Sequence, residues 1–313
     1  MITNVSTAKD FEEHSLMFLN LAWDTIFDLL LEHSNAAGWA TDSRTGEVDD
    51  ELSVDFWEAA KRPLSVAHAL AQQGAELAIK SLVAATSPFL LVCAPPSAWP
   101  SGCDRENTAF ADFHIIDAQE LIRACNAVCD SPLPDEFVTT FDKFRRQRNA
   151  LFHTVDERLD FSYKEIVQYI LRTAQLIAPG RWPQLRRAHL EERPIFKAYA
   201  VDNVGNCLCQ EMEHVIEILG RHELLGFFGF KKNQRRYICP RCYWDCNRDW
   251  NPPYPRTAQL HPNTPASTNL HCFVCGSDVA VIRRSCQQAE CKGNVINVDD
   301  DHECLTCFEA QDE

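Results

Sequence analysis

The sequence predicts a mainly α-helical protein that ends in a small Cys-rich region with short β-strands. Two observations support this fold class. Apolar residues recur at helical spacing through residues 7–180, and after residue 236 the chain becomes rich in Cys, Pro, Asn and Asp. We expect a helical bundle over residues 1–180, a linker with one short helix over residues 181–236, and the Cys-rich region over residues 237–313.

Five helices are expected in the N-terminal part. The first carries an N-cap signal, Thr7 with Asp10, and then Trp23 and Ile26 among apolar residues at helical spacing. A polar loop and a Pro-rich connection flank the second helix, and five helices joined in this way indicate a bundle. The predicted helices cover residues 7–33, 64–86, 115–129, 134–153 and 162–178.

Composition limits the class of protein. The chain has 313 residues, of which 45% are hydrophobic, so it can bury a sizeable core. No apolar run reaches the length of a membrane span, and the polar start lacks the features of a signal peptide. We therefore expect a cytoplasmic protein without a membrane partner. In that compartment its 15 Cys should be free thiols or metal ligands more often than disulfides.

Charge is divided unevenly along the chain. The formal net charge is −15, but residues 1–142 carry 7 Lys and Arg against 23 Asp and Glu. Residues 143–256 carry 20 Lys and Arg against 13 Asp and Glu. An acidic body with a basic middle can still hold a phosphate backbone locally, although ordinary solvated faces explain the same pattern.

The cysteines of the C-terminal region form two sets with the spacing of metal ligands. The first set combines two pairs with two residues between their members, which is the usual way to wrap one tetrahedral Zn²⁺. The second set is similar, but its first pair has four residues between its members. With four thiolates each, neither set leaves a ligand position for a catalytic water, so we expect two structural zinc ions in tandem zinc ribbons. The sets are Cys239, Cys242, Cys272 and Cys275, and Cys286, Cys291, Cys304 and Cys307.

Other cysteines have simpler interpretations. Cys125 and Cys129 are four apart on a predicted helix and fit small core residues. A third metal cluster of Cys207, Cys209 and His214 is conceivable, but buried Cys is more often merely packed. Two further residues are alternative ligands in the ribbons, Cys246 and His302.

The stretch RRQRNALFH, residues 145–153, places charge on an apolar helix face. Phe144 and Leu151 belong to an apolar stripe, and Arg148 falls on the same stripe. A charge there is costly unless it is paired or reaches an interface. Asn149 and His153 are four apart and so share a face. Three neighbouring cations would attract phosphate, which makes them candidate RNA-binding residues: Lys143, Arg145 and Arg146.

This stretch resembles the signature of the HEPN superfamily, an Arg, a polar residue, three variable residues and a His. The segment GAELAIKSLV resembles the Glu and Lys pattern of an early HEPN helix, and the order of the helices is similar. The resemblance covers residues 7–180. It implies a metal-independent endoribonuclease that acts as a homodimer, often in toxin–antitoxin or anti-phage defence systems. It also implies catalytic roles for Arg148, Asn149 and His153.

The residue types suit that chemistry. RNA can be cut by its own 2′-hydroxyl, which needs a proton acceptor or donor near neutral pH, and His supplies it. The charge that develops on phosphorus needs a permanent cation, which Arg supplies as a planar fork. Asn149 would orient His153 or a ligand oxygen.

Three other interpretations remain open. Arg148 can pair with a buried acid such as Glu76, in which case His153 is only a cation at the end of a helix. The helical part can then be a non-catalytic module that dimerises, while the ribbons dock nucleic acid or protein. The ribbons can also contact DNA as part of a regulator.

Overall fold

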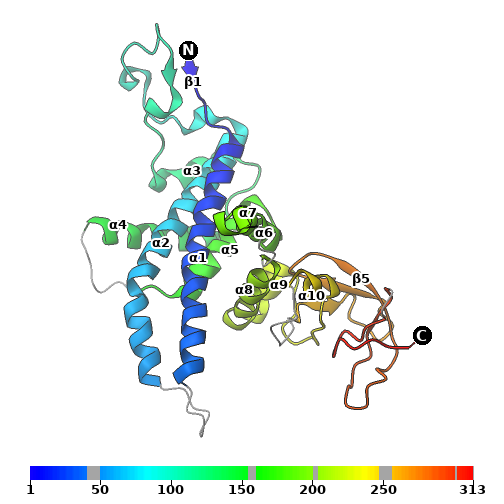
Figure 1. Ribbon diagram of the computed structural model, residues 1–313. Helices are drawn as coiled ribbons and strands as arrows, with labels where there is room; N and C mark the ends of the chain where they lie inside the picture. The colour runs from blue at the N-terminus through cyan, green and yellow to red at the C-terminus, as the bar shows by residue number, and fades with distance from the viewer. Residues whose placement is uncertain (41–49, 154–159, 200–203, 247–255, 300–301, 313) are drawn as a thin grey trace. The chain divides into compact units, whose positions relative to one another are not determined.

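The computed structural model describes residues 1–40, 50–153, 160–199, 204–246, 256–299 and 302–312. It divides into two compact units, Met1–Pro179 and Gly180–Glu313, which we call the first and second unit. The protein is mainly helical, with a small strand-containing Cys-rich region at its C-terminal end, as predicted (Figure 1).

The first unit is a helical bundle built on two long helices that lie side by side (Figure 1). The predicted N-cap of the first helix is present, because the Thr7 hydroxyl accepts from the Asp10 amide and Asp10 accepts from the Thr7 amide. The helices are α1 (Ala8–Ala40), α2 (Asp50–Thr86), α3 (Ala118–Val128), α4 (Asp135–His153) and α5 (Tyr163–Ile177). Short 3-10 turns and two two-residue strands, β1 (Ile2–Thr3) and β2 (Thr108–Ala109), complete the unit.

Helix α2 begins well before the predicted start at residue 64. It runs through Pro63, a residue that removes one backbone hydrogen bond and clashes with the preceding turn. The neighbouring residues Ala60 and Leu64 are each only 3% exposed. Packing of α1 along α2 thus offsets the local cost of proline, which a reading of local sequence cannot anticipate.

Aromatic side chains join α4 to α5 in the core. The predicted stripe of Phe137, Phe141 and Phe144 is buried. Tyr169 of α5 lies against this stripe, with its ring centroid 4.0 Å from that of Phe144. The buried stripe fixes the rotation of α4 about its axis and therefore sets where Arg148 points.

The second unit begins with several helices between residues 181 and 236, where the sequence predicted a linker with a single short helix. Arg186 is 1% exposed and forms two hydrogen bonds with Glu211, Nε to Oε2 at 2.9 Å and Nη2 to Oε1 at 2.8 Å. This paired charge lets α6 pack on α8 although α6 looks too polar for a core helix. The helices are α6 (Trp182–Glu191), α7 (Pro194–Tyr199), α8 (Val204–Ile218), α9 (Arg221–Phe228) and α10 (Pro240–Asp245).

A four-stranded antiparallel sheet carries the Cys-rich region. Its strands follow one another in chain order, so each strand pairs with the next one along the chain. The strands are β3 (Ala258–Leu260), β4 (Asn269–Cys272), β5 (Asp278–Ile282) and β6 (Ile296–Asn297). Among the described residues, no helix is both long and apolar enough to cross a membrane.

Candidate functional site

The structure brings the eight predicted metal-ligating cysteines into two groups of four. In each group, the four Sγ atoms lie within 4.8 Å of one another. The first group is Cys239, Cys242, Cys272 and Cys275, and the second is Cys286, Cys291, Cys304 and Cys307. Each group therefore can hold a metal ion.

The spacing of the sulfur atoms fits zinc. A tetrahedral site with Zn–S bonds of about 2.3 Å has sulfur–sulfur edges of about 3.8 Å. In the first group, Cys239 and Cys275 are 3.7 Å apart and Cys242 and Cys272 are 3.6 Å apart. In the second group the corresponding edges, Cys286 to Cys307 and Cys291 to Cys304, are 3.8 and 3.9 Å. Both donor sets match a tetrahedral ion bound by thiolates alone.

Local structure positions each thiol. Cys239 is the N-cap of α10, and Cys272 ends β4. Thr257 places its hydroxyl 3.2 Å from the Cys272 sulfur, as an orienting partner for a ligand. Gly293 lies so close to the second group that a Cβ there would meet the Cys304 sulfur at 2.5 Å. Only glycine lets the backbone approach this closely, and nothing in the Cys spacing revealed that requirement.

The two groups share one framework. The Ile238 amide donates to the Leu305 carbonyl at 2.9 Å, which ties the first group's opening segment to the turn of the second. The rings of Tyr243 and Phe308 stack with their centroids 3.6 Å apart. The region is therefore one interlocked body with two thiol groups. An ion in either group would stabilise the other.

The third cluster considered from the sequence does not assemble. Cys209 lies 3.6 Å from Cys246, but within the described part of the chain no metal-ligand group of three or more includes Cys207, Cys209 or His214. His302 turns away from the second group, since its Nδ1 contacts the Asn297 carbonyl at 3.3 Å. Cys246 also lies outside both groups.

In the first unit, Arg148 of α4 forms an ion pair with Glu76 of α2 through Nη2 and Oε1. Glu76 is 7% exposed, whereas the Arg148 side chain is 27% exposed. The pairing of Arg148 with a buried acid, expected when its role is structural, is thus present. It also anchors the guanidinium at the surface rather than letting it swing in solvent.

A chain of buried polar side chains continues from this pair. Gln72, one turn before Glu76, donates to Glu76 Oε1 at 3.3 Å and accepts from the Tyr169 hydroxyl at 2.8 Å. Burial raises the pKa of Tyr169 well above its ordinary value, and the charge of Glu76 adds to this, so Tyr169 stays a neutral donor. Arg148, Glu76, Gln72 and Tyr169 therefore form a continuous network across three helices.

His68 lies one further turn along the same face of α2. Its ring stacks on Phe144 at 4.3 Å, and Nε2 contacts Gln147 Oε1 at 3.1 Å. Burial lowers the pKa of His68 to about 4, so the ring is neutral near pH 7. No described residue pairs with its Nδ1. No role was predicted for His68. His68, Gln72 and Glu76 recur at every fourth position of α2, and this spacing is the signal that could have grouped them.

The three flanking cations have acidic partners. Lys143 Nζ lies 2.7 Å from Glu165 Oε2. Arg145 and Arg146 share Asp142, at 2.7 and 2.6 Å. Because these pairs are at least partly exposed, each contributes little to stability and its cation can exchange partners.

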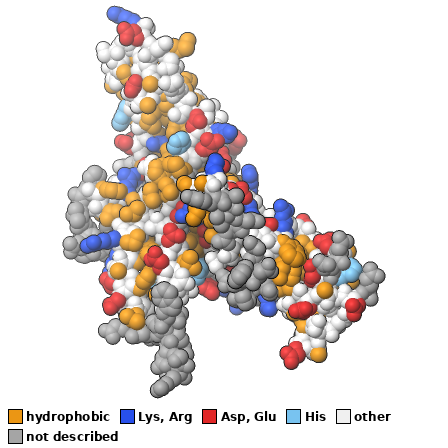
Figure 2. Space-filling view, viewed as in Figure 1, with side chains coloured by type: hydrophobic (Ala, Val, Ile, Leu, Met, Phe, Trp, Pro, Cys, Tyr) orange, Lys and Arg blue, Asp and Glu red, His pale blue; other side chains and the backbone are white. Residues whose placement is uncertain are grey.

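Arg148 also lies on the wall of a pocket of about 620 Å³ formed by α1, α2 and α4. The rest of the wall is mostly apolar and includes Phe18, Leu70 and Leu151. Two of its side chains are strongly exposed, Val66 at 55% and Phe152 at 64%. Figure 2 shows hydrophobic side chains on the viewed face of the first unit, among charged ones.

The other two candidate catalytic residues are less completely described. Asn149 is partly exposed on α4, next to Arg148. His153 is the last residue of α4, and its side chain lies outside the described residues. The backbone thus keeps Asn149 and His153 one turn apart on one helix, as predicted.

Compared with known proteins, the chain matches no family model, no curated protein and no solved structure.

Proposed function

We propose that this protein is a metal-independent endoribonuclease of the HEPN type that acts as a homodimer in the cytoplasm. A toxin or an anti-phage defence effector is the role we favour, with an antitoxin or defence protein as a partner. The observation that carries the proposal is the place of Arg148: a guanidinium anchored by a buried carboxylate, on the wall of an open pocket, five residues before His153 on the same helix.

The division of labour follows from the side chains. Glu76 accepts a hydrogen bond from Nη2 of Arg148. A guanidinium carries five N–H donors, so further donors of Arg148 remain for a phosphate. His153 would take the proton of the RNA 2′-hydroxyl or return one to the leaving oxygen. Arg148 would stabilise the charge that develops on the phosphate oxygens. The products would carry 2′,3′-cyclic phosphate and 5′-hydroxyl ends.

The exposed apolar side chains around the pocket support the homodimer. Val66 and Phe152 flank Arg148, and Met17 and Leu21 on α1 are 42% and 39% exposed. A second copy that covered these side chains would bring two Arg148 residues toward one cleft. In the second unit, zinc would fill both thiol groups and hold the region in shape to recruit RNA or a partner.

A non-catalytic binding module is the alternative, and one observation favours it. Arg148 and its three flanking cations all have acidic partners. In this alternative the network is only a means of burying charge. The two functions differ in whether loss of Arg148 abolishes cleavage in a protein that still folds.

The test is RNA cleavage in the presence of EDTA, with end-group analysis of the products. Arg148→Ala leaves Glu76 buried without its partner, so it should be studied together with Arg148→Ala/Glu76→Gln, which removes the orphan charge. The single and the double variant should each lose cleavage by about 10²–10⁴-fold, and so should Arg148→Lys and His153→Ala. Arg256→Ala, an exposed arginine of the second unit, is the matched control and should cut normally.

The outcome separates the two functions. Loss of cleavage with retained helical content supports catalysis by Arg148 and His153. Full activity in folded Arg148→Ala/Glu76→Gln would refute that role. A monomer at tens of micromolar in sedimentation would refute the dimer, and a wild-type protein that never cuts RNA would leave the binding module.

A further inference from the structure

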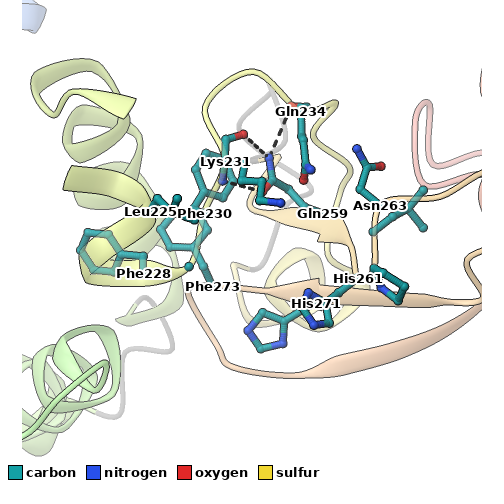
Figure 3. A pocket seen from close by; sticks show the side chains of 13 residues that line it. Leu225, Phe228, Phe230, Lys231, Gln234, Gln259, His261, Asn263, His271 and Phe273 are labelled. Atoms are coloured by element: carbon teal, nitrogen blue, oxygen red, sulfur yellow. Dashed lines mark hydrogen bonds between the residues drawn. The ribbon is translucent and has the colours of Figure 1, made fainter. Parts of the chain in front are cut away.

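The second unit holds a pocket that neither the thiol groups nor the Arg148 network uses. It lies between α9, the segment that follows α9, and strands β3 and β4 (Figure 3). Its volume is about 370 Å³, within the range of about 300–1,000 Å³ that is usual for small-molecule sites. The pocket is thus large enough for one small ligand or one unit of a polymer.

One wall of the pocket is aromatic. Gly229 adopts φ +66° and ends α9, and this left-handed residue turns the chain so that Phe230 lies beside the helix it follows. Phe230 then packs on Phe273 with ring centroids 4.6 Å apart, and Phe228 lies 5.7 Å from the same ring. Phe230 and Phe273 are buried, whereas Phe228 is half-buried and offers part of its ring to the pocket.

The opposite wall is polar, and the strand pleat explains why. Alternate residues of a strand face the same side, and Gln259 shares its face with its cross-strand partner His271. His261 lies one residue past β3 and continues the pairing, because its amide donates to the Asn269 carbonyl. The two imidazole rings lie 6.5 Å apart on this wall (Figure 3). Asp278, opposite His271 on β5, accepts from His271 Nδ1 at 2.9 Å and so fixes the ring.

The pocket's charge is opposite to that of the chain. Although the protein has a formal net charge of −15, no Asp or Glu is among the described residues that line the pocket. Lys231 is exposed at its mouth, and no described acceptor holds its ammonium group. The side-chain amide of Gln259 grips the Lys231 backbone, accepting from its N–H at 2.9 Å and donating to its carbonyl at 2.7 Å. The fold therefore fixes the backbone from which this lysine side chain extends.

We infer that this pocket binds a nucleotide. The base would stack on the half-buried ring of Phe228 and the imidazole of His271, and the phosphate would lie at Lys231 and His261. The side-chain amides of Gln234 and Asn263, which also line the pocket, offer donors and acceptors to the edge of the base. An acidic peptide would use the cations but would have no need of the flat rings.

The nucleotide can be free or part of a single strand. A single-stranded RNA as its source rests on the proposed function, but the nucleotide site itself does not require that Arg148 cuts RNA. If the ligand is part of a single-stranded RNA, the second unit would hold an unpaired base of the strand that the first unit cleaves.

The experiment measures binding without cleavage. The full-length, zinc-loaded protein is titrated into a short fluorescent 2′-O-methyl RNA, which lacks the free 2′-hydroxyl that the proposed reaction needs. AMP, duplex RNA and an acidic aromatic peptide serve as competitors. We expect the single strand to bind best and AMP to displace it. If AMP binds as tightly as the strand, the free nucleotide is the ligand.

Variants locate the binding to the pocket. Phe228→Leu keeps an apolar side chain but removes the flat ring, and it should weaken binding roughly 5- to 150-fold. Lys231→Gln should reduce the slope of log affinity against log salt by about 0.7. Lys292→Gln and His222→Ala change exposed residues of the same unit outside the pocket and should bind like the wild type.

Several results would overturn the inference. The first is that Phe228→Leu and Lys231→Gln bind as tightly as the control variants. The second is that only the peptide binds, or that duplex and single strand bind equally well. The third is that no nucleotide binds at millimolar concentration. If the pocket variants weaken binding while no form of the protein cuts RNA, the nucleotide site stands and the proposed nuclease fails. Zinc content and far-UV circular dichroism confirm that each variant is folded.

Discussion

The two units of this protein are stabilised by different kinds of core. In the first unit, large side chains from different helices are almost fully buried, among them Trp23, Phe141 and Tyr169. In the Cys-rich part of the second unit, the strands have only two to five residues, and three cysteines are fully buried: Cys239, Cys272 and Cys304. Long helices can bury enough apolar surface to fold alone, whereas a small region of short strands needs a further source of stability.

The difference extends to the polar groups. The first unit buries a charge by pairing it, as Arg148 does with Glu76, and extends the pair with neutral donors. The second unit gathers two groups of four sulfur atoms that would repel one another as thiolates, so we expect its stability to depend on cations from outside the chain. Because each kind of stabilisation belongs to one unit, a change in one unit leaves the other as a reference.

Metal removal should have the largest effect. Structural zinc supplies about 10 kcal/mol or more in regions of finger size. We expect a strong chelator to release two zinc ions per chain and to abolish hydrogen-exchange protection in β3–β6, while the amides of α2 and α5 stay protected. Mass spectrometry of peptides and a chromophoric zinc assay measure both. Persistent protection of the strands after complete metal loss would show that apolar packing is sufficient there.

Loss of one ligand should separate the two thiol groups. Cys239→Ser should lower the zinc content from two ions to one or fewer. We also expect it to weaken the remaining ion, because Ile238 and Tyr243 connect the first group to the turn of the second. Cys93→Ser changes an exposed thiol of the first unit and should keep both ions. Retention of two tightly held ions by Cys239→Ser would contradict the ligand assignment.

The sequence predicted the thiol groups because their ligands are encoded locally. Each knuckle is a short motif, and the chemistry of zinc leaves few ways to combine four such pairs. The helices of the bundle were also predictable, since Phe137, Phe141 and Phe144 recur at helical spacing and are buried. The pairing of Arg148 was foreseen as one of two possibilities, because a charge on an apolar stripe must find a partner or an interface.

Features that depend on tertiary packing were not predictable. Gln72 and Tyr169 lie far apart in the sequence and become partners only when α2 meets α5. Helix α6 looks polar in the sequence, but its Arg186 can be buried because Glu211, 25 positions further on, pairs with it. Helix α2 starts before Pro63 and packs along α1. In each case the information lies in a second segment that local periodicity does not identify.

Breaking the buried ion pair should destabilise the first unit by a smaller amount than metal removal destabilises the second. Glu76→Gln leaves Arg148 without its carboxylate, and the loss of one partner of a buried pair costs about 3–5 kcal/mol. We expect about 3 kcal/mol, since Arg148 is partly exposed. Urea unfolding, monitored through the hydrogen exchange of α2 and α5 amides, measures this change in the free energy of unfolding. Asp142→Asn removes a carboxylate that is 40% exposed and is shared by Arg145 and Arg146, and it should cost less than about 1 kcal/mol. Equal costs for the two variants would contradict the burial argument.

The smallest effect should come from the protonation of His68. Its folded pKa of about 4 lies below the ordinary value of 6.5, so on acidification the unfolded chain binds a proton before the folded one does. The contribution is fully present above pH 6.5 and is lost as the pH falls toward 4. Between pH 7 and pH 5 the first unit should lose about 2 kcal/mol, since each pKa unit corresponds to about 1.4 kcal/mol.

His68→Phe keeps a ring against Phe144 and cannot titrate, so most of this pH dependence should vanish, whereas His222→Ala should retain it. Hydrogen exchange of α2 and α5 amides at the two pH values, corrected for intrinsic rates, isolates the first unit from acid-driven zinc loss in the second. An equally steep pH dependence in His68→Phe would show that another group in the first unit is responsible.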